Sequence, residues 1–371
     1  MGITRQLILC GLLSFSTAAW TQNTKIVIPA GTPEDKELST ISAEPDAQKR
    51  IALYEDFAKK YAANNAAVAY ADWQLSQQYL AAGDSAKALE YGDKALELYP
   101  HDLDIVVSLV NVAQAMKDNG KIVDYAVRGA AIFNSIATQP KPADVSEDDW
   151  KARVADEQGS AHSDYEFVEA AAYNAIADEQ DPNKRMSYIE KFTPAFPESR
   201  FEQPVSQLAL YSLQQLNQPQ RLESYGEKAL AANAESIPTL LMLANAYSED
   251  PKQEAKAITY ANKVIAIVAK NPNPDKNQKV AAGVAHSTLG YAYMKEDKFT
   301  SAVTELKTAV GMLQDDPQAQ QAAYFRLGFS YAKLDRKADS VAALQKAAGM
   351  DGPYRSLAKE TLAKINAASK K

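Results

Sequence analysis

The sequence predicts an all-α protein built from repeated helix pairs, and three observations support this prediction. Glycine is scarce, at 15 of 371 residues, and long alanine-rich runs favour helix over sheet. No stretch alternates apolar and polar residues for long enough to indicate a strand. One pattern also occurs twice, as 289-LGYAYMKEDKFTSAVTELKTAV-310 and, 38 residues later, as 327-LGFSYAKLDRKADSVAALQKAA-348.

Residues 1–19 predict an export signal. Arg5 precedes the apolar run 7-LILCGLLSFSTAA-19, which ends in the small residues that a signal peptidase prefers. The run is shorter than the ~20 apolar residues of a membrane span, so an uncleaved anchor is the weaker alternative. Cys10, the single cysteine, follows Leu9 rather than a small residue, which disfavours a lipid anchor. We expect an exported protein, in the periplasm or cell envelope of a bacterium, that carries no thiol once the signal is removed.

Residues 20–45 predict a flexible tether, because three prolines interrupt them and they show no helical period. At most, 26-IVIP-29 is expected to form a short extended piece. From residue 46 to residue 352, helical segments follow one another with short breaks. Residues 353–371 place apolar side chains on one stripe, as expected for a helix that caps the last repeat; these are Leu357, Leu362 and Ile365.

Three segments in the helical region share one spacing. Each has a Leu and a Tyr four residues apart in its first helix, and two small residues seven apart in its second helix. This spacing keeps each pair on one helix face, where a neighbouring helix must pack. The sets are Leu289, Tyr293, Ala302 and Ala309; Leu327, Tyr331, Ser340 and Ala347; and Leu75, Tyr79, Ala88 and Ala95. A small residue follows each leucine, so that the second helix can approach closely.

This pattern resembles the tetratricopeptide repeat, a helix–turn–helix unit of about 34 residues with a W-x2-L-G-x2-Y signature. The chain departs from it at Ser76, which replaces glycine, at Ser340, which replaces alanine, and at Asp72 and His286, which replace a large aromatic residue. The resemblance implies an all-α, right-handed α-solenoid of about seven antiparallel helix pairs over residues 46–352.

A longer duplication includes these repeats. The stretch 46-DAQKRIALYEDFAKKY-61 resembles 181-DPNKRMSYIEKFTPAF-196 at an offset of 135 residues, and 91-YGDKALELYPHD resembles 225-YGEKALAANAES at an offset of 134. Residues 46–165 and 181–289 therefore form two copies of one multi-repeat block. We expect the two copies to continue into a single solenoid.

The resemblance also implies an inner, concave groove, lined by first-helix residues, that binds a peptide or a partner helix. Packing between repeats is the alternative role for each of these residues. Trp73 and Gln77 stand where members that clamp a terminal carboxylate carry Lys and Asn, so that activity is not expected. Carried over residue by residue, the groove consists of Tyr70, Trp73, Gln77, Asn245, Tyr291, Met294, Lys295, Phe325, Phe329 and Lys333.

Neither charge nor motifs indicate catalysis. The net charge of −7 and the absence of a basic run disfavour nucleic acid as a partner and electrostatic docking to anionic lipid, so any membrane association would be peripheral. No phosphate-binding loop, nucleophile elbow or H-E-x-x-H motif occurs. His162 and His286 share a G-x-A-H-S context, which would suit a ligand or catalytic pair, although duplication of a packing residue is the favoured interpretation. We expect neither to have a second histidine or a carboxylate at i+4, so no metal and no cofactor are expected.

We therefore expect a non-catalytic scaffold that binds a protein or peptide partner, whose identity the sequence does not specify. Two alternatives belong to other classes. One is an exported solenoid that binds a glycan or small molecule through its tyrosine-rich interior. The other is a helical accessory subunit of an envelope enzyme that uses His162 and His286.

Overall fold

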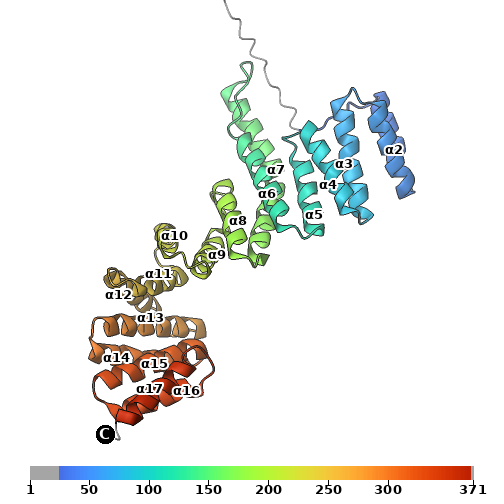
Figure 1. Cartoon of the computed structure of the whole chain (residues 1–371). Helices are drawn as coiled ribbons and strands as arrows, with labels where there is room; N and C mark the ends of the chain where they lie inside the picture. Colours follow the sequence, from blue (N-terminus) through green and yellow to red (C-terminus); the bar gives the residue numbers. More distant parts are fainter. Residues whose placement is uncertain (1–24, 369–371) are drawn as a thin grey trace, which may run out of the picture. The chain divides into compact units, whose positions relative to one another are not determined.

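The computed structural model describes residues 25–368, and all regular secondary structure in this range is helical (Figure 1). The all-α prediction is therefore confirmed. The predicted signal over residues 1–19 and the start of the tether lie outside the described residues. No helix in the described range is both long and apolar enough to cross a membrane.

The chain forms two compact units that divide between Ala171 and Ala172, inside one long helix. The stretch 46–352, expected as one domain, is therefore divided between two compact units. Unit 1 contains α1 (Pro33–Ser42), α2 (Ala47–Lys60), α3 (Asn65–Ala81), α4 (Ser85–Leu98), α5 (Leu103–Ala115), α6 (Asn119–Ile136) and most of α7 (Glu147–Asp178). Unit 2 contains α8 (Pro182–Ala195), α9 (Glu202–Gln215), α10 (Pro219–Ala232), α11 (Ile237–Glu249), α12 (Glu254–Ala269), α13 (Lys276–Lys295), α14 (Phe299–Met312), α15 (Pro317–Lys333), α16 (Lys337–Gly349) and α17 (Arg355–Ala368).

Helix α1 corrects the prediction of a tether over residues 20–45. Thr32 caps this helix by accepting a hydrogen bond from the Asp35 backbone N–H, and Pro33 occupies the first turn. Leu38 and Ile41, three residues apart, are buried in a cluster with residues of α2 and α3. Two apolar residues in a ten-residue helix give too weak a period to identify it from sequence, so tertiary packing decides its formation.

Within each unit, consecutive helices pack as pairs, and each pair packs on the next. Five pairs are joined by a three-residue turn whose middle residue has a positive φ: Gly83, Lys117, Asn217, Asp297 and Asp335. The residue after it donates its N–H to a carbonyl five positions back, as Lys298 does to Tyr293 at 2.8 Å. This is the left-handed C-terminal motif that satisfies carbonyl groups at a helix end.

Small residues set the distance between paired helices. A Cβ added to Gly290 on α13 would lie 2.5 Å from Cγ of Leu306 on α14, and one on Gly328 of α15 would lie 2.6 Å from Cγ of Leu344 on α16. The predicted role of glycine in close helix approach is therefore confirmed.

Two serines that depart from the repeat pattern bind backbone across a helix pair. Ser76 donates its hydroxyl to the Ala88 carbonyl at 2.7 Å, and Ser340 donates to the Gly328 carbonyl at 2.7 Å. Both hydroxyls are buried, and the hydrogen bond offsets the cost of burying them. A serine thus replaces the usual small residue without widening the gap between the two helices.

The same contacts occur at equivalent residues in both copies of the duplication, and they confirm how the two sequences align. Arg50 binds the Glu44 carbonyl as Arg185 binds the Glu179 carbonyl. The Tyr125 hydroxyl donates to Asp93, and the Tyr260 hydroxyl donates to Glu227 at the matching positions. Gly92 lies against Leu109 and Gly226 against Leu243, both at an offset of 134. Residues of α2–α6 therefore have structural counterparts in α8–α12.

Helix α17 packs on α16 as the predicted end cap. Ala358 is buried in a cluster with Leu344 and Ala347, and Leu362 and Ile365 pack against this cluster. Leu357, assigned to the same apolar stripe from sequence, is instead 49% exposed. The buried face of α17 is centred one residue later than predicted.

We expect Gly290→Ala to destabilise the protein by about 1–3 kcal/mol, because its Cβ would overlap Leu306. Gly311→Ala on α14 is the matched control, since nothing lies within 4 Å of a Cβ added there. The control should be stabilising by about 0.4–1 kcal/mol through the lower entropy of the unfolded chain. Urea unfolding followed by circular dichroism measures both effects. Equal unfolding midpoints for the two variants would contradict the role assigned to Gly290.

Candidate functional site

In unit 1, a segment of the chain itself is bound across the ends of several helices. The Ile26 backbone N–H donates to Asp102 Oδ2 at 3.0 Å, and Lys25 Nζ lies 3.3 Å from Asp104 Oδ2. Ile26 packs against a cluster from α3, α4 and α5, and Ile28 against a cluster from α1–α5. Val27, between them, is 67% exposed. This alternation is typical of an extended backbone, so residues 25–29 lie on unit 1 as a bound peptide would.

Acidic side chains surround the basic end of this segment. Asp102 is buried, and burial raises its pKa, while the hydrogen bond from Ile26 lowers it. Burial and the charge of Asp104 also raise the pKa of Asp164, and the nearby Lys25 ammonium opposes that shift. Asp104 and Asp164 thus both interact with the Lys25 ammonium, which favours a basic residue at this position.

The bond from Ile26 to Asp102, at the start of α5, locates the segment along one edge of unit 1. Here α2 and α4 end, and α3 and α5 begin. We call this surface the unit 1 edge; its residues in the two clusters are Phe57, Ala58, Tyr61, Ala66, Ala67, Ala95, Leu98 and Leu103, together with Asp102.

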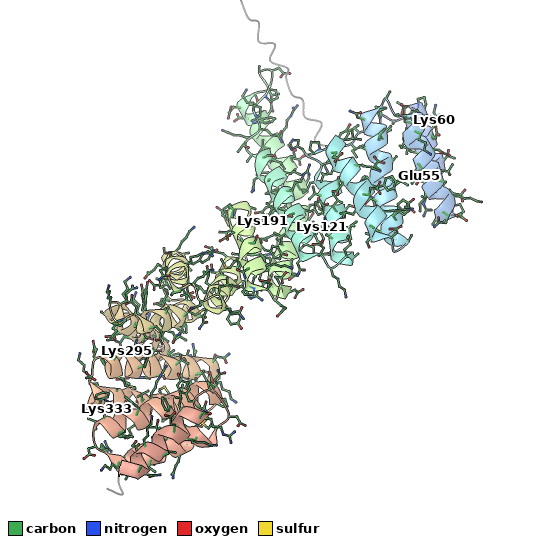
Figure 2. All side chains as sticks on the ribbon, viewed as in Figure 1. Glu55, Lys60, Lys121, Lys191, Lys295 and Lys333 are labelled. Carbon is green, nitrogen blue, oxygen red and sulfur yellow. The ribbon has the colours of Figure 1, made fainter. Side chains whose placement is uncertain are left out.

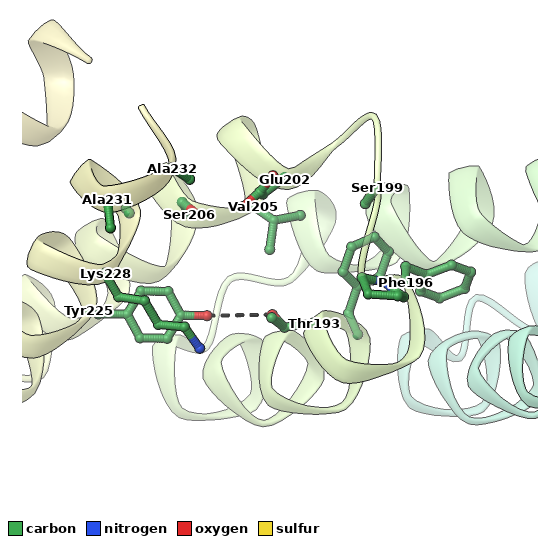
Figure 3. A pocket seen from close by; sticks show the side chains of 13 residues that line it. Thr193, Phe196, Ser199, Glu202, Val205, Ser206, Tyr225, Lys228, Ala231 and Ala232 are labelled. Carbon is green, nitrogen blue, oxygen red and sulfur yellow. Dashed lines mark hydrogen bonds between the residues drawn. The ribbon is translucent and has the colours of Figure 1, made fainter. Parts of the chain in front are cut away.

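Unit 2 has a cavity of about 330 Å³ between the end of α8, the start of α9 and α10 (Figure 3). Phe192, Phe196 and Val205 give it apolar walls, and the Tyr225 hydroxyl lies 3.5 Å from the Thr193 hydroxyl on one side. A second hollow, of about 180 Å³, shares Ala229 and Ala232 with it and reaches the start of α11. We call the two together the unit 2 edge cavity.

A separate groove in unit 2 crosses four first helices, α9, α11, α13 and α15. Its volume is about 450 Å³, and the connection after α16 closes one end. Apolar side chains line it together with three amides and one carboxyl group. The residues that line this first-helix groove are Gln214, Leu241, Met242, Asn245, Val284, Asp316, Gln318, Ala319, Ala322, Pro353 and Tyr354.

Of the ten predicted groove residues, Asn245 lines this groove, where its side chain is exposed. Sequence reasoning missed Leu241, Met242, Gln318 and Ala322, although the helical period places Leu241 and Asn245 on one face of α11.

Aromatic and aliphatic members of the predicted set mainly pack between helices. The rings of Tyr70 and Trp73 meet edge to face, with their centroids 6.2 Å apart, and both pack against the unit 1 clusters. The buried Trp73 Nε1 has no hydrogen-bond partner among the described residues. Met294 packs against the cluster of α14 and α15. The ring centroids of Phe325 and Tyr354 lie 5.2 Å apart. Gln77 is half-buried on α3.

The two predicted lysines, which are labelled in Figure 2, make different contacts. Lys295 Nζ donates to the Ser248 carbonyl at 2.7 Å and lies 5.0 Å from the Tyr291 ring, so it ties α13 to α11. Lys333 is exposed and lies 5.6 Å from the Phe329 ring. The Lys333 side chain is therefore accessible to a partner, whereas the Lys295 ammonium is already hydrogen-bonded within the fold.

The two histidines do not occupy equivalent environments. His286 is largely buried, and its Nδ1 lies 2.6 Å from Glu305 Oε2 on the adjacent α14. His162 is exposed, and its Nε2 lies 3.8 Å from Oε1 of Glu166, four residues further along α7. The expectation that no carboxylate stands at this spacing is therefore wrong. The likeness of the two G-x-A-H-S contexts therefore did not predict a shared packing role. Among the described residues, no group of three His, Cys, Asp or Glu side chains is arranged to hold a metal ion.

Asp72 is buried on α3, at the position where the repeat pattern places an aromatic residue. Burial raises its pKa to about 6, and the charge of Lys94 opposes that shift. The unpartnered Trp73 Nε1 is its neighbour in sequence, so this part of α3 carries two polar groups that helix packing leaves poorly satisfied.

Comparison with protein families identifies residues 321–354 as a tetratricopeptide repeat. This segment lies over α15 and α16, where the sequence pattern placed the last repeat, so the predicted tetratricopeptide repeat is confirmed there. A comparison with curated proteins found no match.

Three solved structures illustrate what the chain is similar to. Yeast Tom70 is 14% identical with a TM-score of 0.39, covering 94% of this chain and 67% of Tom70. PilW, titled a widely conserved type IV pilus biogenesis factor, is 17% identical with a TM-score of 0.31, covering 67% of this chain and 93% of PilW. The P58(IPK) TPR domain is 14% identical with a TM-score of 0.33, covering 91% of this chain and 99% of that domain. Because these scores are low, the chain's own repeats define its architecture.

We expect Ile26→Asp to release the segment from the unit 1 edge, because a carboxylate would face the apolar cluster and Asp102. The loss should be about 1–2 kcal/mol of stability, with faster amide exchange over residues 25–29. Val27→Asp is the control, since Val27 is exposed. Hydrogen exchange by mass spectrometry and urea unfolding measure both variants. Equal exchange rates in the two would contradict the bound position of the segment.

We expect Asp72→Asn to raise the melting temperature at pH 7.5. Because the pKa of folded Asp72 is about 6, above the ordinary 3.8, its contribution to stability is present below about pH 4 and is lost as pH rises through 6. The advantage of the variant should therefore shrink as pH falls from 7.5 to 4. Thermal unfolding at several pH values tests this, with the exposed Asp56→Asn as control. An advantage that does not change with pH would refute the assignment.

Proposed function

We propose that the chain is a non-catalytic scaffold that binds another protein in the first-helix groove of unit 2, and the tetratricopeptide repeat over residues 321–354 supports this proposal. One observation carries this proposal. Four successive first helices contribute to one surface that the described residues leave open. Export to the periplasm or envelope of a bacterium is part of the proposal and is supported by the run 7-LILCGLLSFSTAA-19.

The chemistry of the groove suits a peptide or a short helix. Leu241, Met242 and Ala319 offer apolar area, while Asn245 and Gln318 offer amides that can bind backbone groups of an extended segment. Met242 is adaptable in shape, which is common at binding surfaces. The amides and the apolar area together give a ligand both orientation and affinity.

Contacts between helices support the wall of the groove. Lys295 ties α13 to the end of α11, and Phe325 packs against Tyr354 where the groove closes. A preformed surface loses less entropy when a partner binds. The predicted residues Lys295 and Phe325 thus support the groove.

A photo-crosslinking residue in place of Asn245 tests the proposal in the native cell. We expect one discrete protein adduct from this position, and none from Thr259, an exposed control on the second helix α12. Adding Met242→Arg should reduce the yield of this adduct about 10-fold or more, because a charge would enter the groove. Circular dichroism would show that the variant is folded.

Three outcomes would contradict the proposal. These are a saccharide adduct instead of a protein, equal adducts from positions 245 and 259, or an adduct that Met242→Arg leaves unchanged in a folded protein.

A further inference from the structure

The unit 2 edge cavity occupies the position in its copy that residues 25–29 occupy in unit 1. Its residues correspond, at offsets of 134 or 135, to residues of the unit 1 edge: Phe192 to Phe57, Thr193 to Ala58, Phe196 to Tyr61, Ala229 to Ala95, and Ala232 to Leu98. Ser236 in the adjoining hollow corresponds to Asp102, the residue that binds the Ile26 backbone. The same edge is therefore covered by an extended segment in unit 1 and open in unit 2.

Two local differences create the open space. Ala232 replaces Leu98, which removes three carbon atoms from the cavity wall. Helix α9 begins at Glu202, whereas the offset from the start of α3 at Asn65 would place its first residue at 199. The connection from Phe196 to Phe201 thus replaces one turn of helix, and the cavity opens beside it (Figure 3).

The charged groups at this edge differ from those of unit 1. Asp102 and Asp104, which surround Lys25, are replaced by Ser236 and Pro238. Lys228 lines the cavity at the position of Lys94. Lys94 binds Glu90 at 2.6 Å, but Ser224 stands at the matching position, so Lys228 has no ion pair among the described residues. Glu202, also on the cavity wall, lies across from it (Figure 3).

We propose that the unit 2 edge cavity binds an extended peptide from a partner protein, with two branched apolar side chains two residues apart and an acidic residue after the second. The apolar spacing follows Ile26 and Ile28 in unit 1. Lys228 lies on the side of Thr193 and Tyr225, whose counterparts Ala58 and Tyr91 pack in the cluster that holds Ile28. The carboxylate of the peptide therefore follows its second apolar residue. This site is separate from the first-helix groove, and its test is independent of the groove's.

The probe is a fluorescent peptide of sequence TIVIE, compared with TIVIK and with TSVSE, in which serine replaces both isoleucines. Anisotropy with the full chain at low salt should show TIVIE binding about 3- to 5-fold more tightly than TIVIK, as expected for one exposed ion pair. TSVSE should bind at least about 10-fold more weakly, since burial of the two apolar side chains supplies most of the affinity. Lys228→Gln should abolish the difference between TIVIE and TIVIK.

Ala232→Leu blocks the cavity with the residue that unit 1 carries at Leu98, and should weaken TIVIE at least about 10-fold. Ala234→Leu is the control, because Ala234 is exposed and does not line the cavity. Ala231→Leu, at the cavity wall, provides a second blocking variant if the first fails to fold.

Several results would overturn the proposal. One is equal binding of TIVIE to the folded blocking variants and to the Ala234→Leu control. Another is binding of TSVSE as tight as that of TIVIE. The chain's own sequence KIVIP, used as a peptide, tests for a second copy as occupant. If KIVIP binds more tightly than TIVIE and Lys228→Gln has no effect, the cavity receives the N-terminal segment of another copy instead of an acidic partner.

Discussion

The close approach of neighbouring helices at small residues is the constraint on which the rest of the structure depends. Gly290 and Gly328 on first helices face leucines of their own second helix, while Gly92 and Gly226 on second helices face leucines of the next first helix. The same device therefore sets the spacing within pairs and between pairs. A larger side chain would separate the helices and expose the apolar faces that drive the stack together.

Chain reversal between paired helices depends on a second local device. The middle residue of the three-residue turn takes a left-handed conformation, which glycine adopts without strain at Gly83. Lys117, Asn217, Asp297 and Asp335 take the same conformation at a cost that the buried pair offsets. Four of the five reversals therefore place a residue other than glycine in the left-handed conformation.

The duplicated blocks show how one packing scheme yields different surfaces. The contacts that hold each copy together are retained, including the Arg50 and Arg185 bonds to a preceding carbonyl. The edges have diverged, because residues at helix ends can change without disturbing the helix interfaces. Unit 1 covers its edge with residues 25–29, and unit 2 carries an open cavity with an unpaired lysine there. Divergence at helix ends can thus alter binding while the core stays constant.

The sequence by itself determined the helical class, the repeat unit and its packing residues, because these follow from local periodicity and from the size of single side chains. Leu289, Tyr293 and the small Gly290 could all be recognised from their spacing. Only the tertiary structure decided the rest. Helix α1 forms because Leu38 and Ile41 find a partner in α2, and Trp73 and Phe325 pack between helices because neighbouring rings and clusters surround them. The open surfaces also depend on several elements at once, since a cavity forms where residues distant in sequence fail to fill a space.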